Sequence, residues 1–434
     1  MKLWSKEKTS TAEQIEQFTV GNDRDFDLLM AGFDVDGSIA HVTMLGEQGL
    51  MTPELAAKAI AELKKIRDEI NAGNFSIDAG AEDIHSQIEW MLTQRIGDAG
   101  KMIHTGRSRN DQVALDIKLF LRSSLNDLRV DILNLFDLLQ KKSEEHKKTL
   151  IPGYTHFQIA MPSSIGLWLG AYAESLVDDM EFIAAAYKVT NKNPLGSGAG
   201  YGSSFPLNRT RTTSLLNFQT LNYNSVYAQM SRGKTEKLVS SAISSVAATL
   251  SKLSMDCCLF INQNFGFISF PDELTTGSSI MPHKKNPDVF ELIRAKCNRI
   301  QAVPNELTLL TNNLPSGYHR DMQLTKEVLF PAIEQLRSCL SMMQLMLNSM
   351  TVRSNILQEE KYKYIFSVEA VNELVNKGVP FRDAYAQVGN SIDSATFNFD
   401  ATKQLHHTHE GSIGNLCNDK IREEMKRVAD FTSI

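Results

Sequence analysis

The chain has 434 residues, with 45 Lys and Arg against 51 Asp and Glu, which gives a formal net charge of −6 at pH 7. This mild acidic excess argues against nucleic acid or an anionic membrane as the main partner, because both favour broad basic surfaces. Gly and Pro make up about 8.5% of the chain, against a usual 12% or so. The composition therefore favours long helices and excludes the disordered, collagen-like and disulfide-scaffold classes.

The first residues, MKLWSKEKTS, lack an apolar core segment and predict no signal peptide. No stretch of about 18 uncharged apolar residues occurs in the chain, so no membrane span is predicted. The five cysteines form no C-x-x-C pair, and most stand in apolar helical stretches. This pattern is typical of buried, reduced thiols. Because thiols stay reduced in the cytoplasm, we expect a cytoplasmic protein.

Three regions are predicted along the chain. Residues 1–107 form an N-terminal domain of shorter helices, one of which begins at Pro53 with Thr52 as its N-cap. Residues 108–358 form a central domain of long helices. Residues 359–434 form a small helical C-terminal domain.

The central region has the periodicity of long helices. Runs of 45, 32 and 46 residues, which begin at Arg107, Lys234 and Ala332, contain neither Gly nor Pro. From Leu121 to Leu139 an apolar residue recurs every three or four positions, a heptad-like stripe typical of a helix packed nearly parallel to others. Similar stripes begin at Trp168, Leu238 and Leu329. The predicted fold is all-α, an elongated bundle of long helices.

Small residues cover several sides of the helix expected at 240–254, SSAISSVAATLSKLS. A helix covered in this way can be buried on more than one side. We therefore expect helix packing between subunits as well as within one.

Four segments depart from the helical pattern and concentrate Gly, polar and charged residues. The first, residues 104–112, reads HTGRSRNDQ at the head of the first long helix. Its cations, its Asn and a free helix N-terminus favour an anion site. A capped helix with a solvated charge cluster explains the same residues equally well, and both interpretations stay open.

The second segment, residues 152–162, places His156 on a turn bounded by Gly and Pro, where a titratable imidazole could meet a ligand. A lone loop histidine is nevertheless more often structural. The third, residues 275–287, reads TTGSSIMPHKKNP. A mobile loop of this kind could carry a hydroxyl and an ammonium group onto an anionic substrate. A solvated basic loop is the alternative, and the density of unusual residues argues against it.

The fourth segment, residues 314–326, carries polar side chains at spacings of two to four residues, within helical reach of one another. They are Tyr318, Arg320, Gln323 and Lys326. A loop that ends in a capped amphipathic helix would explain the backbone but not the choice of side chains.

The sequence contains no P-loop, no Rossmann glycine fingerprint and no His-Glu-x-x-His zinc helix. His406, His407 and His409 could bind a metal ion, but neighbouring histidines in a C-terminal loop more often do not. No metal site is predicted.

The third segment resembles the GSSxMPxKxN signature of the fumarase/aspartase superfamily. The matched positions are Gly277, Ser278, Ser279, Met281, Pro282, Lys284 and Asn286. The other three segments narrow the resemblance to the argininosuccinate lyase family, whose HTGRSRNDQ, GYTH and LPSxYxxDxQxxK stretches are similar here. The likeness runs from about residue 15 to residue 390.

The resemblance implies a homotetramer with a core of 20 helices and active sites that each draw on three subunits. It also implies reversible cleavage of argininosuccinate into arginine and fumarate, the last step of arginine biosynthesis, by anti β-elimination with no cofactor. A base removes a proton beside a carboxylate, and an acid protonates the departing guanidino nitrogen. The aci-carboxylate intermediate needs strong oxyanion stabilisation.

Carried over position by position, the resemblance implies a catalytic set in which Ser278 abstracts the proton, with Lys284 and loop closure to activate it. His156 is the implied acid, oriented by Glu291, although the acid and base roles of Ser278 and His156 could be reversed. The implied substrate-binding residues are His85, Ser108, Arg109, Asn110, Thr155, Asn286, Tyr318, Gln323 and Lys326.

The chain departs from the family pattern near its N-terminus, where the family has a substrate-contacting serine. Here the sequence reads FTVGNDRD, and Asp23 or Arg24 could take that place. His283 stands where many relatives have Gln, and the HHTHEGS segment that begins at His406 differs from the common ending. These departures concern the arginine side of the pocket rather than the reaction.

Two alternatives are kept. One is another fumarate-releasing lyase of the superfamily, such as adenylosuccinate lyase, fumarase or aspartase, which the first and fourth segments disfavour. The other is a non-catalytic structural protein of the crystallin type. The intact set of Ser278, His156, Lys284 and Glu291 argues against it.

Overall fold

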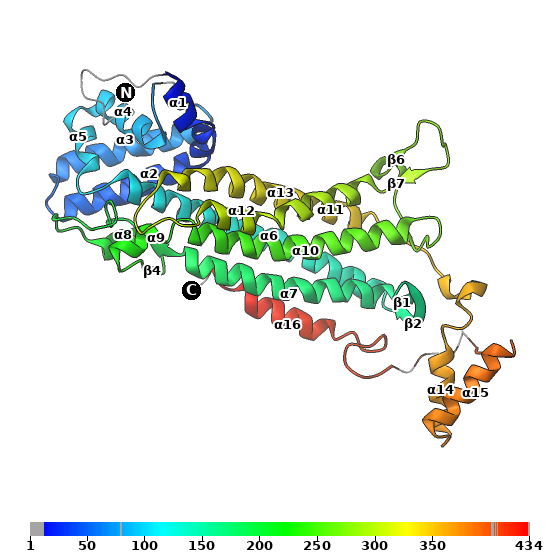
Figure 1. Ribbon diagram of the computed structural model, residues 1–434. Coiled ribbons are helices and arrows are strands. Elements are labelled where there is room, and N and C mark those ends of the chain that lie inside the picture. Colours follow the sequence, from blue (N-terminus) through cyan, green and yellow to red (C-terminus); the bar gives the residue numbers. More distant parts are fainter. Residues whose placement is uncertain (1–12, 79, 401–402, 404, 406, 433–434) are drawn as a thin grey trace.

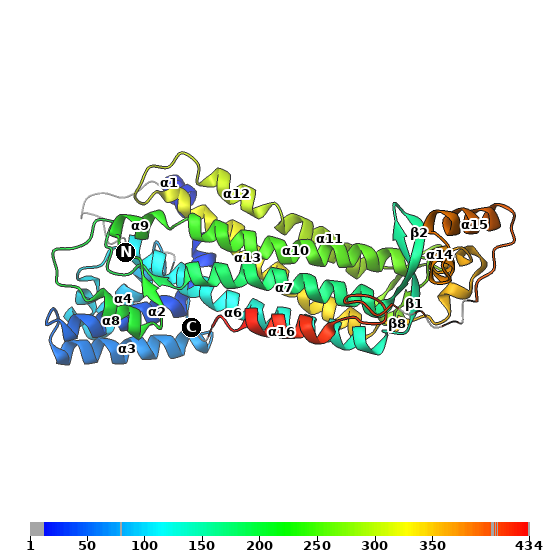
Figure 2. The same ribbon diagram turned by 90° about the horizontal axis from the view of Figure 1, so that it is seen from below.

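The computed structural model describes residues 13–78, 80–400, 403, 405 and 407–432. It shows an elongated bundle of long helices, with a group of shorter helices at one end and a small helical pair at the other (Figures 1 and 2). The predicted all-α fold is confirmed, because the strands in the described chain are confined to short two-stranded pairs. The first ten residues, on which the signal-peptide prediction depends, lie outside the described range.

The long helices run side by side along the molecule (Figures 1 and 2). They are α6 (Arg109–Glu145), α7 (Ile165–Thr190), α10 (Lys234–Ile261) and α13 (Leu324–Asn348), and the shorter α11 (Asp288–Ile300) and α12 (Val303–Leu310) lie with them. At 1.5 Å per residue, the 37 residues of α6 span about 55 Å. This length separates the two ends of the subunit.

The apolar stripes form the core of the bundle. The stripe from Leu121 to Leu139 and the one from Leu329 to Leu347 are completely buried, as the heptad-like spacing predicts. In α10 the stripe from Ala242 to Cys257 is buried too, but Leu238 is 39% exposed. The beginning of α10 therefore exposes an apolar side chain on the surface of the chain.

The N-terminal end has a core of its own, which packs against the bundle through α2. Its helices are α1 (Glu13–Val20), α2 (Asp23–Glu47), α3 (Pro53–Asn71), α4 (Ile84–Ile96), α5 (Asp98–Lys101) and η1 (Met102–His104). Thr52 caps α3 as predicted, since its side chain accepts a hydrogen bond from Leu55 N at 3.4 Å. The connection between α7 and α10 also lies at this end and carries β3 (Lys192–Asn193), α8 (Arg209–Leu215), β4 (Thr220–Leu221) and α9 (Ser225–Met230).

The opposite end carries two antiparallel hairpins (Figure 1). One pairs β1 (Leu150–Thr155) with β2 (Gln158–Ser164), and the other pairs β6 (Thr276–Gly277) with β7 (Lys285–Asn286). A third short pair joins β5 (Ile268–Ser269) to β8 (Thr351–Val352), with η2 (Asp272–Leu274) following β5. The hairpins project beyond the helices rather than covering them.

The last part of the chain contains η4 (Ile356–Gln358), η5 (Glu360–Tyr362), α14 (Ser367–Asn376), α15 (Phe381–Asp393) and α16 (Asn418–Ala429). Helices α14 and α15 pack on each other, whereas α16 returns along α7 (Figure 2). The division at residues 107 and 358 stays a prediction.

By length and composition, α2 and α10 could each cross a membrane, with a mean hydropathy of 1.2 over their most apolar windows. In the fold, 61% of the α2 window and 50% of the α10 window are buried. Core helices of a bundle have the same composition, so these two helices are weak indications of a membrane span.

Candidate active site

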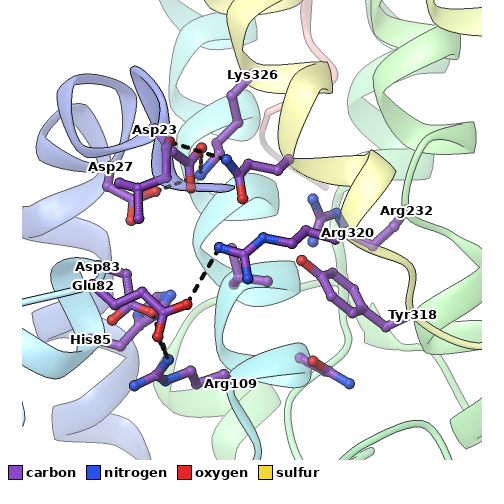
Figure 3. A pocket seen from close by; sticks show the side chains of 14 residues that line it. Asp23, Asp27, Glu82, Asp83, His85, Arg109, Arg232, Tyr318, Arg320 and Lys326 are labelled. Carbon is purple, nitrogen blue, oxygen red and sulfur yellow. Dashed lines mark hydrogen bonds and ion pairs between the residues drawn. The ribbon is translucent and has the colours of Figure 1, made fainter. Parts of the chain in front are cut away.

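A cleft of about 280 Å³ opens at the N-terminal end, where the beginnings of α2, α4 and α6 meet η3 (Arg320–Gln323) and α13 (Figure 3). Six of the predicted substrate-binding residues line it. They are His85, Arg109, Asn110, Tyr318, Gln323 and Lys326. The first and fourth polar segments therefore meet in space, although they stand about 200 residues apart in the sequence.

The N-terminus of α6 supports one wall of the cleft. Ser108 is the N-cap: its hydroxyl accepts from Asn110 N at 3.3 Å, and its backbone N–H donates to Asp111 Oδ1 at 2.8 Å. This capping box places Arg109 and Asn110 in the first helical turn. The helix is capped, as one interpretation of the first segment predicts, and its first residues line the cleft. The anion site stays a prediction.

Glu82 joins two arginines from opposite walls (Figure 3). Its carboxylate lies 3.1 Å from Arg109 Nη1 and 3.4 Å from Arg320 Nη2. Arg109 also pairs with Asp83 at 3.1 Å and donates to Ser86 Oγ at 2.7 Å. A substrate carboxylate that binds Arg109 or Arg320 must compete with Glu82.

Lys326 closes the inner part of the cleft together with two aspartates. Its Nζ lies 2.7 Å from Asp23 and 2.5 Å from Asp27, and the lysine is 3% exposed. Burial raises the pKa of Asp23 to about 6, although the positive charge of Lys326 acts to lower it. Burial alone would lower the pKa of Lys326, but Asp27 and Asp23 outweigh it and raise that pKa.

Of the two residues considered for the place of the family's serine, only Asp23 lines the cleft. Arg24 instead donates from Nε to the carbonyl of Ala81 at 2.9 Å and holds the loop before α4. Gln323 donates to the carbonyls of Thr19 at 3.1 Å and Val20 at 3.2 Å. These bonds fix the turn between α1 and α2 over the cleft.

The proposed proton abstractor lies at the other end of the subunit, on the β6–β7 hairpin (Figure 1). Ser278 is half-buried, and its hydroxyl accepts from the backbone N–H of Met281 at 3.1 Å. Asn286 donates to the carbonyl of Gly277 at 3.4 Å, and Lys284 is exposed. Within one chain, the structure does not bring this hairpin to the cleft.

Thr155 and His156 lie on the β1–β2 turn, apart from the cleft. His156 and Phe157 have φ values of 54° and 58°, and Thr155 pairs with Gln158, as in a two-residue hairpin with a type I′ turn. A left-handed conformation is costly for such side chains and often marks a functional position. Glu291 lies in the first turn of α11 and forms no ion pair with His156 in the described chain.

Sequence reasoning missed several residues that line the cleft. They are Val20, Asp27, Glu82, Asp83, Val113 and Arg232. Arg320, which was named with the fourth segment but not among the substrate-binding residues, lines the cleft too. Glu82 and Asp83 stand three and two residues before His85, and Arg320 stands within the fourth segment, so both segments offered a signal. Arg232 offered none, because it reaches the cleft from the loop before α10.

One group of potential metal ligands occurs among the described residues. Three buried side chains, Asp34, His85 and Asp116, bring one potential ligand atom each to within 4.8 Å of one another. Of the C-terminal histidines, His406 lies outside the described residues, and His407 Nε2 is 2.9 Å from Glu369.

Residues 7–302 match the model of a family described as Lyase. The chain is 57% identical over 429 residues to an argininosuccinate lyase of Bacteroides thetaiotaomicron, covering 99% of this chain and 96% of the relative. It is 58% identical over 429 residues to one of Bacteroides fragilis, covering 99% and 95%. The crystal structure of an EDDS lyase in complex with formate superposes with a TM-score of 0.78 at 22% identity, over 98% of this chain and 93% of that one, which shows a shared fold.

Proposed function

The chain belongs to the lyase family and, within it, to the argininosuccinate lyases, and from this premise we propose how its residues cleave argininosuccinate into arginine and fumarate. The enzyme is a carbon–nitrogen lyase that works by anti β-elimination. We place it in the cytoplasm. The mixed charges of the cleft match those of argininosuccinate, which carries carboxylates together with a guanidinium and an ammonium group. Arginines and aspartates both line the cleft, so each charge of the substrate can meet a side chain of the opposite sign.

The separation of the site residues within one chain is the main support for a site shared among subunits. The cleft lies at one end of the bundle, and Ser278 and His156 lie on hairpins at the other, with the length of α6 between them. No rotation of a side chain spans that distance. The proposed active site therefore joins the cleft of one subunit to the β1–β2 turn of a second and the β6–β7 hairpin of a third.

Exposed apolar side chains support an assembly of this kind. Phe157 and Ile280, at the tips of the two hairpins, are 80% and 82% exposed in the single chain. Large apolar residues are exposed on the bundle helices too, among them Phe182, Leu238, Leu292, Leu309 and Leu345. The proposed assembly is a homotetramer with a 20-helix core, in which these faces pack against other subunits.

In the assembled site, Ser278 and His156 form the acid–base pair. Lys284 and the backbone N–H groups of its loop stabilise the alkoxide form of Ser278. The alkoxide removes the proton beside the carboxylate. His156 protonates the leaving nitrogen, and Glu291 orients its ring. The reversed assignment of the two roles uses the same groups.

The remaining residues hold the substrate. Asn110, Arg109, Tyr318, Gln323, Lys326 and His85 act from the cleft, and Thr155 and Asn286 act from the two hairpins. Ser108 acts through the helix cap that places Arg109 and Asn110. Arg109 and Lys284 supply positive charge for carboxylates, which is the charge that the developing aci-carboxylate requires.

Fumarate release tests the proposed reaction. Purified protein incubated with argininosuccinate should produce an increase in fumarate absorbance, and light scattering should give about four times the 48.5 kDa chain mass. Turnover of adenylosuccinate in place of argininosuccinate would contradict the proposed substrate. A stable, active monomer would contradict the shared site.

A further inference from the structure

A buried Asp–His–Asp triad lies directly behind the cleft. His85 Nδ1 is 2.9 Å from Asp34 Oδ1 and 3.6 Å from Asp116 Oδ2. The three residues come from α4, α2 and α6, and none is more than 5% exposed. His85 also lines the cleft, so one side of its ring faces the triad and the other side belongs to the substrate site.

The hydrogen bonds of the triad indicate which of its side chains carry a charge. Asp34 Oδ1 also accepts from Gln112 Nε2 at 2.6 Å, whereas Asp34 Oδ2 and both oxygens of Asp116 have no hydrogen-bond partner among the described residues. Two ionised carboxylates cannot lie side by side in a buried site without a large repulsion. A proton on one oxygen of Asp116, shared with Asp34 Oδ2, would satisfy two of the three orphaned oxygens and remove that repulsion.

The electrostatic balance agrees with this distribution of protons. Burial and the neighbouring Asp34 raise the pKa of Asp116 well above its usual range. Burial alone would lower the pKa of His85, but Asp34, Asp83 and Asp116 outweigh it and raise that pKa to about 9. The charged or titratable groups around the ring come from α2, α4, α6, η1 and the loop before α6. They are Asp34, Asp83, Asp116, Arg109, His104 and Arg107.

We propose that Asp34, as an anion, and Asp116, as a protonated acid, are positioning residues that hold His85 as a cation whose Nε2–H binds a carboxylate of the substrate. Among the described residues, the bonds of His85 are made by Nδ1, which leaves Nε2 for the cleft. The inference rests on the proposed function. It adds to Arg109 a second cation on the same wall, one that is fixed by burial and does not depend on a flexible side chain.

A divalent metal ion is the other occupant that three such side chains could hold. The amide N–H of Gln112 donates to Asp34 Oδ1 at 2.6 Å, and the guanidinium of Arg107 lies close enough to lower the pKa of Asp34. Donors and cations around the ligand atoms favour a proton over a metal ion. Elemental analysis of the purified enzyme distinguishes the two.

The direct test is a titration of His85 by NMR in the intact enzyme labelled with ¹³C at histidine Cε1. The chain has ten histidines, and His85→Gln identifies the signal. In the wild type, the signal should stay that of an imidazolium from pH 6 to pH 8 and should shift when arginine and fumarate are added together. A signal that titrates below pH 7, or bound metal in a one-to-one ratio, would overturn the proposal.

Three substitutions separate the roles of the two aspartates. Asp34→Asn removes the anion, so the His85 signal should titrate below pH 7, and KM at pH 8 should rise about tenfold or more, the loss of one charge-assisted hydrogen bond. The rise in KM should shrink at pH 6, where His85 is protonated again; a purely structural defect would not recover. Asp116→Asn resembles the protonated acid, so it should keep the imidazolium and change KM less than about threefold.

Asp179→Asn is the matched control, a buried aspartate in α7 that bonds to Ser245 and Thr249 instead. It should change neither the signal nor KM.

If Asp116→Asn abolishes the imidazolium as Asp34→Asn does, the assignment of the proton is wrong. If Asp34→Asn fails to fold, the wild-type and Asp116→Asn titrations still decide. An enzyme that releases no fumarate contradicts the proposed function, while the His85 titration remains a separate result.

Discussion

The two ends of the bundle hold their polar residues in opposite ways. At the cleft, Lys326, Arg232 and His85 are almost completely buried, and each lies within 3.1 Å of a carboxylate of its own chain. At the hairpins, Lys284 is exposed and Ser278 bonds only to the backbone of its own loop. The difference indicates a preorganised binding surface at one end and, at the other, reactive groups whose partners are outside their own chain.

The largest expected effect comes from the hairpin end. Ser278→Ala should lower kcat by about a thousandfold, within the range that a general base contributes, and should leave folding intact because the hydroxyl bonds to the backbone of its own hairpin loop. The measurement is steady-state fumarate release, with circular dichroism as the folding check. His283→Gln, in the same loop, is the matched control and should keep wild-type turnover. Near-normal activity of Ser278→Ala would contradict the role given to this serine.

The cleft end should make stability depend on pH. His85 binds its proton more tightly in the folded state, with a pKa near 9 against a usual 6.5, so its contribution is complete below about pH 6.5 and is lost as the pH rises through about 9. The full difference corresponds to about 3 kcal/mol in the free energy of unfolding. Denaturant unfolding at pH 7 and pH 10 measures it. The loss should be smaller in His85→Gln; an equal loss in both proteins would place the titrating group elsewhere.

The smallest expected effect concerns the helix cap under the cleft. Ser108→Ala removes the acceptor for Asn110 N and should lower the free energy of unfolding by about 1 kcal/mol. Ser108→Asp should restore that stability, because Asp is an equally good N-cap. Thermal unfolding and KM are measured together. If Ser108→Asp recovers stability while KM stays raised, the hydroxyl binds substrate directly and does not act through the cap.

The sequence predicted the bundle well because helix periodicity is local. The buried stripe from Leu121 to Leu139 needs only the spacing of its own residues. The end of α13 was less predictable. The segment free of Gly and Pro runs on to Lys377, but the helix ends at Asn348, because Thr351 and Val352 pair with β5. Pairing with a distant strand overrides local propensity there.

The site was predictable as a set of residues but not as an arrangement. The motifs identified the polar segments, yet contacts such as Glu82 between Arg109 and Arg320 depend on segments that meet only after folding. Neither the burial of Asp34 and Asp116 nor their contact with His85 follows from spacing in the chain. The separation of Ser278 from the cleft within one chain does not follow from spacing either, and only the resemblance to the family implied a site shared among subunits.

Mixing two inactive variants tests the shared site most directly. Arg109→Met removes a cation from the cleft, and Ser278→Ala removes the hydroxyl from the hairpin, so each tetramer alone should be inactive. When the two chains are refolded together in equal amounts, a site has an intact cleft and an intact hairpin about one time in four, because the two come from different subunits. The account predicts recovery of about a quarter of the wild-type fumarate release. No recovery in mixed tetramers would show that each site is built from a single chain.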